Sequence, residues 1–154
     1  MKPIIFVFSV LVPLLVGFLG SLVTAPAIDG WYQNINKPFF TPPGWLFAPV
    51  WTLLYIFMGV SLYLVLIKAN PLPKAKFLLI FCLQLALNLL WSILFFGFTS
   101  PLLALIEIII LWYAILVLLN LAYKINRLSF IILLPYLLWV SFAAILNAAI
   151  VYLN

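Results

Sequence analysis

The sequence predicts an all-α membrane protein built as a bundle of five transmembrane helices. The first observation is composition: 69% of the 154 residues are hydrophobic and 6% are charged. A water-soluble domain of this size would need an apolar surface, so the composition places the chain in a membrane. The second observation is five apolar stretches, each longer than the roughly 18 residues that indicate a spanning helix. We expect one compact domain over residues 1–154.

The five stretches follow one another with short connections between them. They cover approximately Ile4–Ala25, Trp45–Ile67, Phe77–Phe98, Leu102–Tyr123 and Leu128–Leu153. A single charged residue, Glu107, lies inside them. The first stretch is about 22 residues long, more than the usual 7–15 apolar residues of a signal peptide, so we interpret it as a retained first helix.

Prolines and small residues indicate how these helices turn, bend and touch. Asn70–Pro73 predicts a stiff turn. Pro13, Pro49 and Pro135 predict kinks, which would either open a cavity beside nearby tryptophans or only help the helices to fit together. Small residues spaced for close helix contact lie at Gly17, Ser21 and Ala25, at Gly20 and Thr24, and at Ala144 and Ala148. Such contacts form within a bundle or between two chains, and we expect a homodimer.

Basic residues predict the orientation in the membrane. Six of the seven fall in the N-terminus and in the second-to-third and fourth-to-fifth connections, at Lys2, Lys68, Lys74, Lys76, Lys124 and Arg127. These segments share one side if five helices alternate. The positive-inside rule then places the N-terminus in the cytoplasm and the C-terminus outside, and favours a bacterial cytoplasmic membrane. No basic cluster is dense enough to bind nucleic acid.

The residue types exclude most conventional chemistry. The chain has no histidine, one cysteine (Cys82) and two acids, Asp29 and Glu107. Nucleophile–histidine arrangements, paired carboxylates and the usual metal or haem-ligand sites are therefore ruled out, and we expect no metal and no cofactor. Two interpretations remain open for Glu107: a proton relay, or a neutral or hydrogen-bonded glutamate that ties the fourth helix to a neighbour.

Polar and aromatic residues form a stripe on each of three helices. The stripes are Trp51, Tyr55 and Met58 in the second helix, Gln84, Asn88 and Trp91 in the third, and Trp139, Ala143, Leu146 and Asn147 in the fifth. Their helical spacing puts the members of each stripe on one face. Converging stripes would make an apolar pocket with a few hydrogen-bonding groups. The alternative is that the amides only bond helices together.

The connection before the second helix is unusually aromatic and stiff. Seven aromatic residues occur within the 21 positions from Trp31 to Trp51, with four prolines between them. A stiff aromatic loop over the end of a helical bundle would act as a lid on a site for a flat, lipophilic ligand.

Spaced motifs along nearly the whole chain resemble the TspO/MBR family of membrane proteins. They are Trp31-Tyr32, Lys37-Pro38, Thr41-Pro42-Pro43-Gly44-Trp45, Pro49-Val50-Trp51, Leu54-Tyr55, Met58-Gly59, Leu87-Asn88, Trp91, Phe95-Phe96-Gly97, Pro135-Tyr136-Leu137, Trp139, Phe142-Ala143 and Leu146-Asn147. The resemblance implies a five-helix bundle, commonly dimeric. It also implies binding of porphyrins such as protoporphyrin IX and, in many members, of sterols and benzodiazepine-type drugs.

The resemblance implies a pocket that opens toward the loop between the first two helices. By position, it would be lined by Tyr32, Pro42, Trp51, Asn88, Trp91, Trp139, Ala143, Leu146 and Asn147. Some bacterial relatives promote light-dependent porphyrin breakdown, attributed to tryptophans at the positions of Trp51 and Trp139. The implied functions are therefore a porphyrin receptor or sensor, a photochemical porphyrin-degrading enzyme, or a transporter of porphyrin or another lipophile. Five helices without an internal repeat argue against the last.

The chain departs from the family pattern at two sites that bear on ligands. Phe40 stands where many relatives have tryptophan, which removes an indole N–H from the loop. Val151-Tyr152 replaces a common Trp-Arg pair, and no basic residue follows Tyr152. The sterol motif proposed for animal relatives requires that basic residue, so sterol binding at the C-terminus is not expected.

Overall fold

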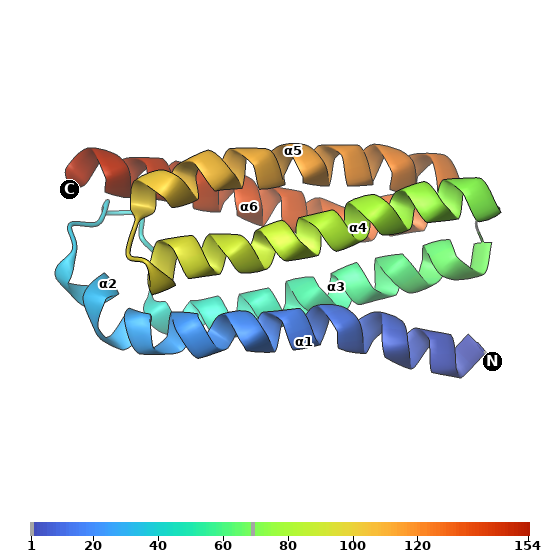
Figure 1. Cartoon of the computed structure of the whole chain (residues 1–154), viewed down its shortest axis with the longest axis horizontal. Coiled ribbons are helices and arrows are strands. Elements are labelled where there is room, and N and C mark those ends of the chain that lie inside the picture. Colours follow the sequence, from blue (N-terminus) through green and yellow to red (C-terminus); the bar gives the residue numbers. More distant parts are fainter. Residues whose placement is uncertain (1, 69) are drawn as a thin grey trace.

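Five long helices form an antiparallel bundle in the computed structural model, which describes residues 2–68 and 70–154 (Figure 1). The helices are α1 (Lys2–Asp29), α3 (Phe47–Lys68), α4 (Pro71–Ser92), α5 (Pro101–Ile125) and α6 (Arg127–Leu153). Each is long and apolar enough to cross a membrane. The predicted fold class, an all-α bundle of five transmembrane helices, is confirmed, and the protein is an integral multi-pass membrane protein.

Three short elements complete the chain. Helix α2 (Trp31–Asn34) and the 3₁₀ turn η1 (Gly44–Leu46) belong to the α1–α3 connection, and the π-helical segment η2 (Ile93–Gly97) extends α4. We call the end of the bundle that carries α2, η1 and the C-terminus the loop end. Figure 1 shows the N-terminus and the α3–α4 and α5–α6 connections at the opposite end.

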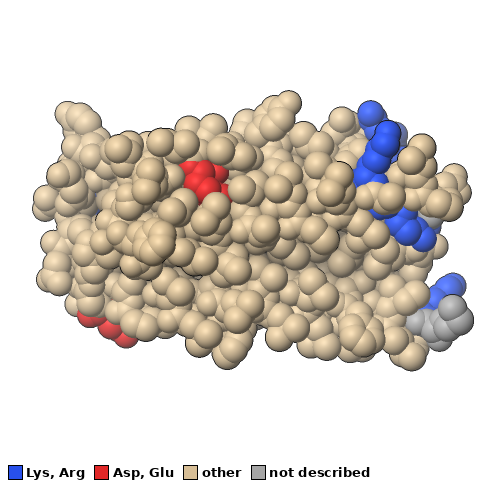
Figure 2. All heavy atoms as spheres, in the orientation of Figure 1, with Lys and Arg blue, Asp and Glu red and all other residues tan. Residues whose placement is uncertain are grey.

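The order of helices around the bundle is α1, α3, α6, α5, α4 and back to α1, where much of the contact runs through η2. Most Lys and Arg side chains gather at the end opposite the loop end, as Figure 2 shows. This matches the grouping of basic residues expected from alternating helices. Which end faces the cytoplasm stays a prediction.

Two expectations about prolines are wrong. Asn70–Pro73 does not form a separate turn, because α4 already begins at Pro71, the helical position where the missing N–H costs nothing. Pro49 lies in the first turn of α3, so it removes no hydrogen bond from that helix and the expected kink loses its physical basis. Pro13 and Pro135 do lie inside α1 and α6.

The π-helical segment η2 shapes the loop end of the bundle. The amide of Phe98 donates to the carbonyl of Ile93 at 2.8 Å, five residues earlier, and so closes a wider turn than an α-helix. This segment holds Phe95 and Phe96, which are both buried. Phe95 stacks on Trp91 with ring centroids 5.1 Å apart, so the turn adds two aromatic rings beside that indole.

Helices α1 and α3 meet through glycine. A Cβ atom on Gly59 would lie 2.8 Å from the carbonyl oxygen of Ser9, and one on Gly17 would overlap the ring of Tyr55. Only glycine allows this approach. Gly17, one member of the predicted stripe of small residues, therefore makes close contact within the bundle.

Candidate ligand-binding site

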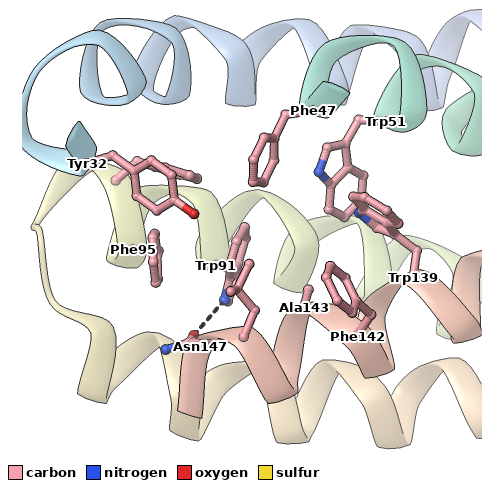
Figure 3. A pocket seen from close by; sticks show the side chains of 11 residues that line it. Tyr32, Phe47, Trp51, Trp91, Phe95, Trp139, Phe142, Ala143 and Asn147 are labelled. Carbon is pink, nitrogen blue, oxygen red and sulfur yellow. Dashed lines mark hydrogen bonds between the residues drawn. The ribbon is translucent and has the colours of Figure 1, made fainter. Parts of the chain in front are cut away.

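An aromatic pocket lies inside the bundle at the loop end, and we call it the aromatic chamber (Figure 3). Residues of α2, α3, α4, η2 and α6 line it: Tyr32, Phe47, Trp51, Trp91, Phe95, Phe96, Trp139, Phe142, Ala143, Leu146 and Asn147. Its free volume is about 20 Å³. That is room for about one water molecule, so without a ligand the rings nearly fill the space themselves.

Seven of the nine residues predicted to bind ligand line the chamber. They are Tyr32, Trp51, Trp91, Trp139, Ala143, Leu146 and Asn147. Pro42 and Asn88 do not line it. The chamber thus joins the predicted stripes of the second, third and fifth spanning helices. Ligand binding by these residues stays a prediction.

Four lining residues, Phe47, Phe95, Phe96 and Phe142, were not among the residues predicted from the sequence to bind ligand. Phe142 follows Trp139 by three positions, a helical spacing that the stripe of α6 already indicated. Phe95 follows Trp91 by four positions and Phe47 precedes Trp51 by four positions, which is also a helical spacing. Phe96 had no such signal, because the wide turn of η2 brings it inward and ordinary helical spacing does not predict that turn.

The hydroxyl of Tyr32 lacks a hydrogen-bond partner. The side chain is only 5% exposed, and no described residue bonds its Oη atom. Figure 3 shows this hydroxyl directed toward the interior of the chamber. Burial raises the pKa of Tyr32 to about 12, so the group remains a neutral donor and acceptor near pH 7. Buried polar groups are rarely left unpaired, which marks this hydroxyl as one that a ligand or water completes.

The tryptophans of the chamber differ in whether their N–H groups are used. Trp91 Nε1 donates to Asn147 Oδ1 at 3.2 Å and so joins α4 to α6. Outside the chamber, Trp112 Nε1 likewise donates to Ser141. Trp51 and Trp139 make no such hydrogen bond within residues 2–68 and 70–154, and both are half-buried. Their indole N–H groups remain available to a ligand.

Asn88 belongs to a buried polar network outside the chamber. Its Oδ1 accepts from the hydroxyl of Tyr55, and its Nδ2 donates to the hydroxyl of Tyr136 at 3.2 Å. Tyr136 in turn donates to Gln84 Oε1 at 2.8 Å, and Gln84 Nε2 lies 3.9 Å from Met58 Sδ. The network ties α3, α4 and α6 together. For Asn88 and Gln84 the structure therefore favours the helix-bonding interpretation.

Glu107 is buried without a partner. Its side chain is 5% exposed, and neither carboxylate oxygen bonds a described residue. Among the described residues, Glu107 therefore has no hydrogen bond that ties two helices together, and its role stays open. The acid lies outside both the aromatic chamber and the polar network just described.

A much larger opening adjoins the chamber, and we call it the lateral cleft. It lies between α1, the first half of α3 and the end of α4, and has a volume of about 690 Å³. Phe47, Trp51, Trp91 and Phe96 line both cavities. This volume lies within the roughly 300–1,000 Å³ of small-molecule sites, whereas that of the chamber does not.

Comparison with known proteins decides the family. The sequence model of the TspO/MBR family matches residues 9–153. The chain belongs to the TspO/MBR family. It is 46% identical to a "Tryptophan-rich protein TspO" from Archaeoglobus fulgidus, over 96% of this chain and 95% of that protein. It is 42% identical to a "Tryptophan-rich protein TspO" from Chlorobaculum tepidum, over 92% and 90%. It is 33% identical to a "Translocator protein" from Bos taurus, over 89% and 82%.

In this TspO/MBR chain the aromatic loop is fastened over the chamber. Phe40 packs edge-on against Phe142, with ring centroids 6.3 Å apart. This is the position at which the family resemblance implies a tryptophan in many relatives. Asn36 and Asn154 hold the loop to the end of α6, since the amide of Asn36 donates to Asn154 Oδ1 at 3.0 Å and Asn154 Nδ2 donates back to the carbonyl of Asn36 at 3.0 Å. The loop therefore has the position that a lid requires.

Proposed function

We propose that this TspO/MBR protein is an integral membrane receptor or sensor that binds porphyrins, such as protoporphyrin IX, and other flat lipophilic ligands, including benzodiazepine-type molecules. Two of the relatives named above are called tryptophan-rich TspO proteins and one a translocator protein, which supports the general class. The observation that carries the proposal is the unpaired, buried hydroxyl of Tyr32, directed into a chamber of aromatic rings. Aromatic walls with a few placed polar groups are the usual design of such sites.

The free indoles support the same proposal. Trp51 and Trp139 line the chamber with unused N–H groups, on α3 and α6 respectively. A flat π-system placed against them gains stacking and finds donors for its polar edge. The chamber must widen to accept such a ligand, and the adjoining lateral cleft supplies the volume.

The test is a titration of the detergent-purified protein with protoporphyrin IX in the dark. Quenching of tryptophan fluorescence measures binding. We expect saturable quenching, with weaker binding by Tyr32→Phe and by a Trp51→Ala, Asn147→Ala double variant. Tyr113→Phe and Trp112→Phe are matched controls, because neither residue lines the chamber or the cleft. Unchanged affinity in the chamber variants, or equal losses in the controls, would contradict the proposed site.

A second candidate function is light-dependent porphyrin degradation. It is favoured by one observation: Trp51 and Trp139, the two tryptophans implied in that chemistry, line the same chamber. An indole there could donate an electron to a photoexcited porphyrin, with dioxygen as the oxidant. Illumination of the titrated sample tests this. Equal porphyrin loss with wild type and with Trp51→Phe, Trp139→Phe protein rules the mechanism out, whereas slower loss in the variant supports it.

Placement in the membrane and assembly complete the proposal. The gathering of basic residues at the end opposite the loop supports a cytoplasmic N-terminus, with the lid and the C-terminus outside, in a cytoplasmic membrane. Labelling of single cysteines placed in the α1–α3 connection of intact cells tests the orientation. The homodimer is tested by measuring the mass of the detergent-solubilised protein.

A further inference from the structure

We infer that the ligand extends from the aromatic chamber into the lateral cleft, and that the cleft selects by charge, favouring a cationic group over a carboxylate on otherwise similar flat lipophiles. The inference rests on the proposed function and adds to it the location and the charge class of the ligand. It follows from the shape of the cleft, from the single charge that lines it and from the position of the nearest basic residue.

The cleft is long and mostly apolar. Its α1 wall runs from Leu14 to Asp29, which is about 22 Å along a helix, and includes the small residues Gly17, Gly20, Ser21 and Ala25. The facing wall contains the rings of Trp45, Phe47, Trp51, Tyr55, Trp91 and Phe96. The α1 wall also contains Leu14, Phe18 and Ile28, so the cleft offers aliphatic and aromatic contacts to a flat lipophile.

Two of the hydroxyls that line the cleft are used within their own helices. The hydroxyl of Ser21 donates to the carbonyl of Phe18 at 2.7 Å, and that of Thr52 to the carbonyl of Ala48 at 2.8 Å. Both groups are therefore occupied by their own helices. Thr24 and Ser92 add neutral hydroxyls to the lining, so these groups offer hydrogen bonds to a ligand but no charge.

One charged residue, Asp29, is among the described residues that line the cleft, and it lies at the last position of α1, at the loop end of the bundle. Asp29 is exposed and makes no salt bridge to a described residue, so its charge is free to act on a ligand. A carboxylate at the edge of a membrane attracts a cationic group and repels another carboxylate. Because protoporphyrin IX carries two propionates, its polar edge meets the wrong sign there.

The basic residue of the same connection does not offset the negative charge of Asp29. Lys37 belongs to the same connection, but its Nζ donates to the carbonyls of Tyr32, Ile35 and Gln33 at 2.6, 3.1 and 3.2 Å. These bonds cap the end of α2, and Lys37 is not a lining residue of the cleft. The other described basic residues belong to the opposite end of the bundle.

The experiment compares three porphyrins that share one ring system and differ in charge. They are protoporphyrin IX, its neutral dimethyl ester and a diamide whose two arms end in amines. Each is titrated in the dark into the full-length protein in an uncharged maltoside detergent. The measured quantity is the ratio of Kd in Asp29→Asn to Kd in wild type for each ligand, because partition into the micelle cancels in this ratio.

We expect Asp29→Asn to weaken binding of the amine derivative and to tighten binding of protoporphyrin IX, each by roughly two- to fivefold, the range of an exposed ion pair. The ester should not respond. Asp29→Lys should change both charged ligands in the same directions by more, and added salt should shrink every difference. Glu107→Gln, the same acid-to-amide change outside the cleft, should leave all three ratios near one. Ser21→Trp, which places a large side chain in the cleft without changing charge, should weaken the binding of all three porphyrins.

Three results would overturn parts of this account in distinguishable ways. Saturable binding of all three porphyrins with equal ratios in Asp29→Asn overturns the charge selection and leaves the proposed function standing. Unchanged binding in Ser21→Trp overturns the placement in the cleft. Absence of saturable binding for every porphyrin overturns the proposed function itself, and the inference with it.

Discussion

The indole nitrogen of Trp91 donates a hydrogen bond to Asn147 Oδ1 at 3.2 Å, across the aromatic chamber from α4 to α6 (Figure 3). The amide nitrogen of the same Asn147 donates to the carbonyl of Pro101 at 2.7 Å, at the start of α5. One side chain therefore lines the proposed site and also fastens three helices at the loop end. We expect its substitution to affect both stability and ligand binding.

A double-mutant cycle measures how much the hydrogen bond between Trp91 and Asn147 contributes to stability. We expect Asn147→Leu to reduce the free energy of unfolding by about 1–3 kcal/mol, because both bonds are lost and Pro101 is left without this partner. Trp91→Phe should cost about 0.5–2 kcal/mol, the range of one interhelical hydrogen bond in a membrane. Unfolding in a denaturing detergent measures both, and the double variant should lose less than the sum. Strict additivity would show that the bond contributes nothing.

Tyr32→Phe should weaken ligand binding without lowering stability. The hydroxyl has no described partner, so its removal is expected to leave the melting temperature of the free protein unchanged or raised. Affinity for a ligand that completes this hydroxyl should fall. Tyr55→Phe is the matched control, because the Tyr55 hydroxyl bonds Asn88 and its loss should lower the melting temperature. A destabilised Tyr32→Phe protein would show that the hydroxyl is already paired.

Asn88→Leu is expected to act on the fold. It leaves the hydroxyl of Tyr55 without its acceptor and deprives Tyr136 of a donor, which should cost about 1–3 kcal/mol of unfolding free energy. Thermal unfolding in detergent measures this loss. Because Asn88 does not line the chamber, folded Asn88→Leu protein should keep its porphyrin affinity. A normal melting temperature with lost porphyrin binding would show that Asn88 contributes to the binding site.

Gly59→Ala should be damaging where Gly20→Ala is mild. A Cβ on Gly59 would meet backbone atoms of Ser9 and Val10, which cannot rotate away, so α1 and α3 must separate at a cost of about 1–3 kcal/mol. A Cβ on Gly20 would lie 3.5 Å from Ser92 Oγ, an ordinary contact. Melting temperatures of the two variants provide the comparison, and equal values would contradict the close packing of α1 on α3.

Glu107→Gln should be neutral or stabilising. The wild-type carboxyl is buried and no described residue bonds it, which is costly for a group that can carry charge. The amide has nearly the same shape and no ionisable proton. We expect an unchanged or higher melting temperature and unchanged porphyrin affinity. A large loss of stability would show that the carboxyl has a partner after all, and a specific loss of activity would revive the proton-relay interpretation.

Sequence patterns predicted the site in part. Helical spacing put Trp51, Trp139 and Asn147 on the correct faces, and the three faces do meet in one chamber. Spacing did not distinguish Asn88 from Asn147, since both are buried amides on the same kind of stripe. Which one lines a cavity depends on the helix opposite, and Asn88 faces the hydroxyls of Tyr55 and Tyr136.

The sequence by itself determined the five spanning helices, the separation of charge between the two ends and the family. These properties depend on apolar length, on residue type and on motifs, which are local or compositional. The tertiary structure decided what the sequence could not: that Tyr32 is buried with an unpaired hydroxyl, that η2 turns Phe96 inward and that α1 borders a cleft of about 690 Å³. The reason is physical. A helix face is set by its own periodicity, whereas the space in front of that face is set by how neighbouring helices pack.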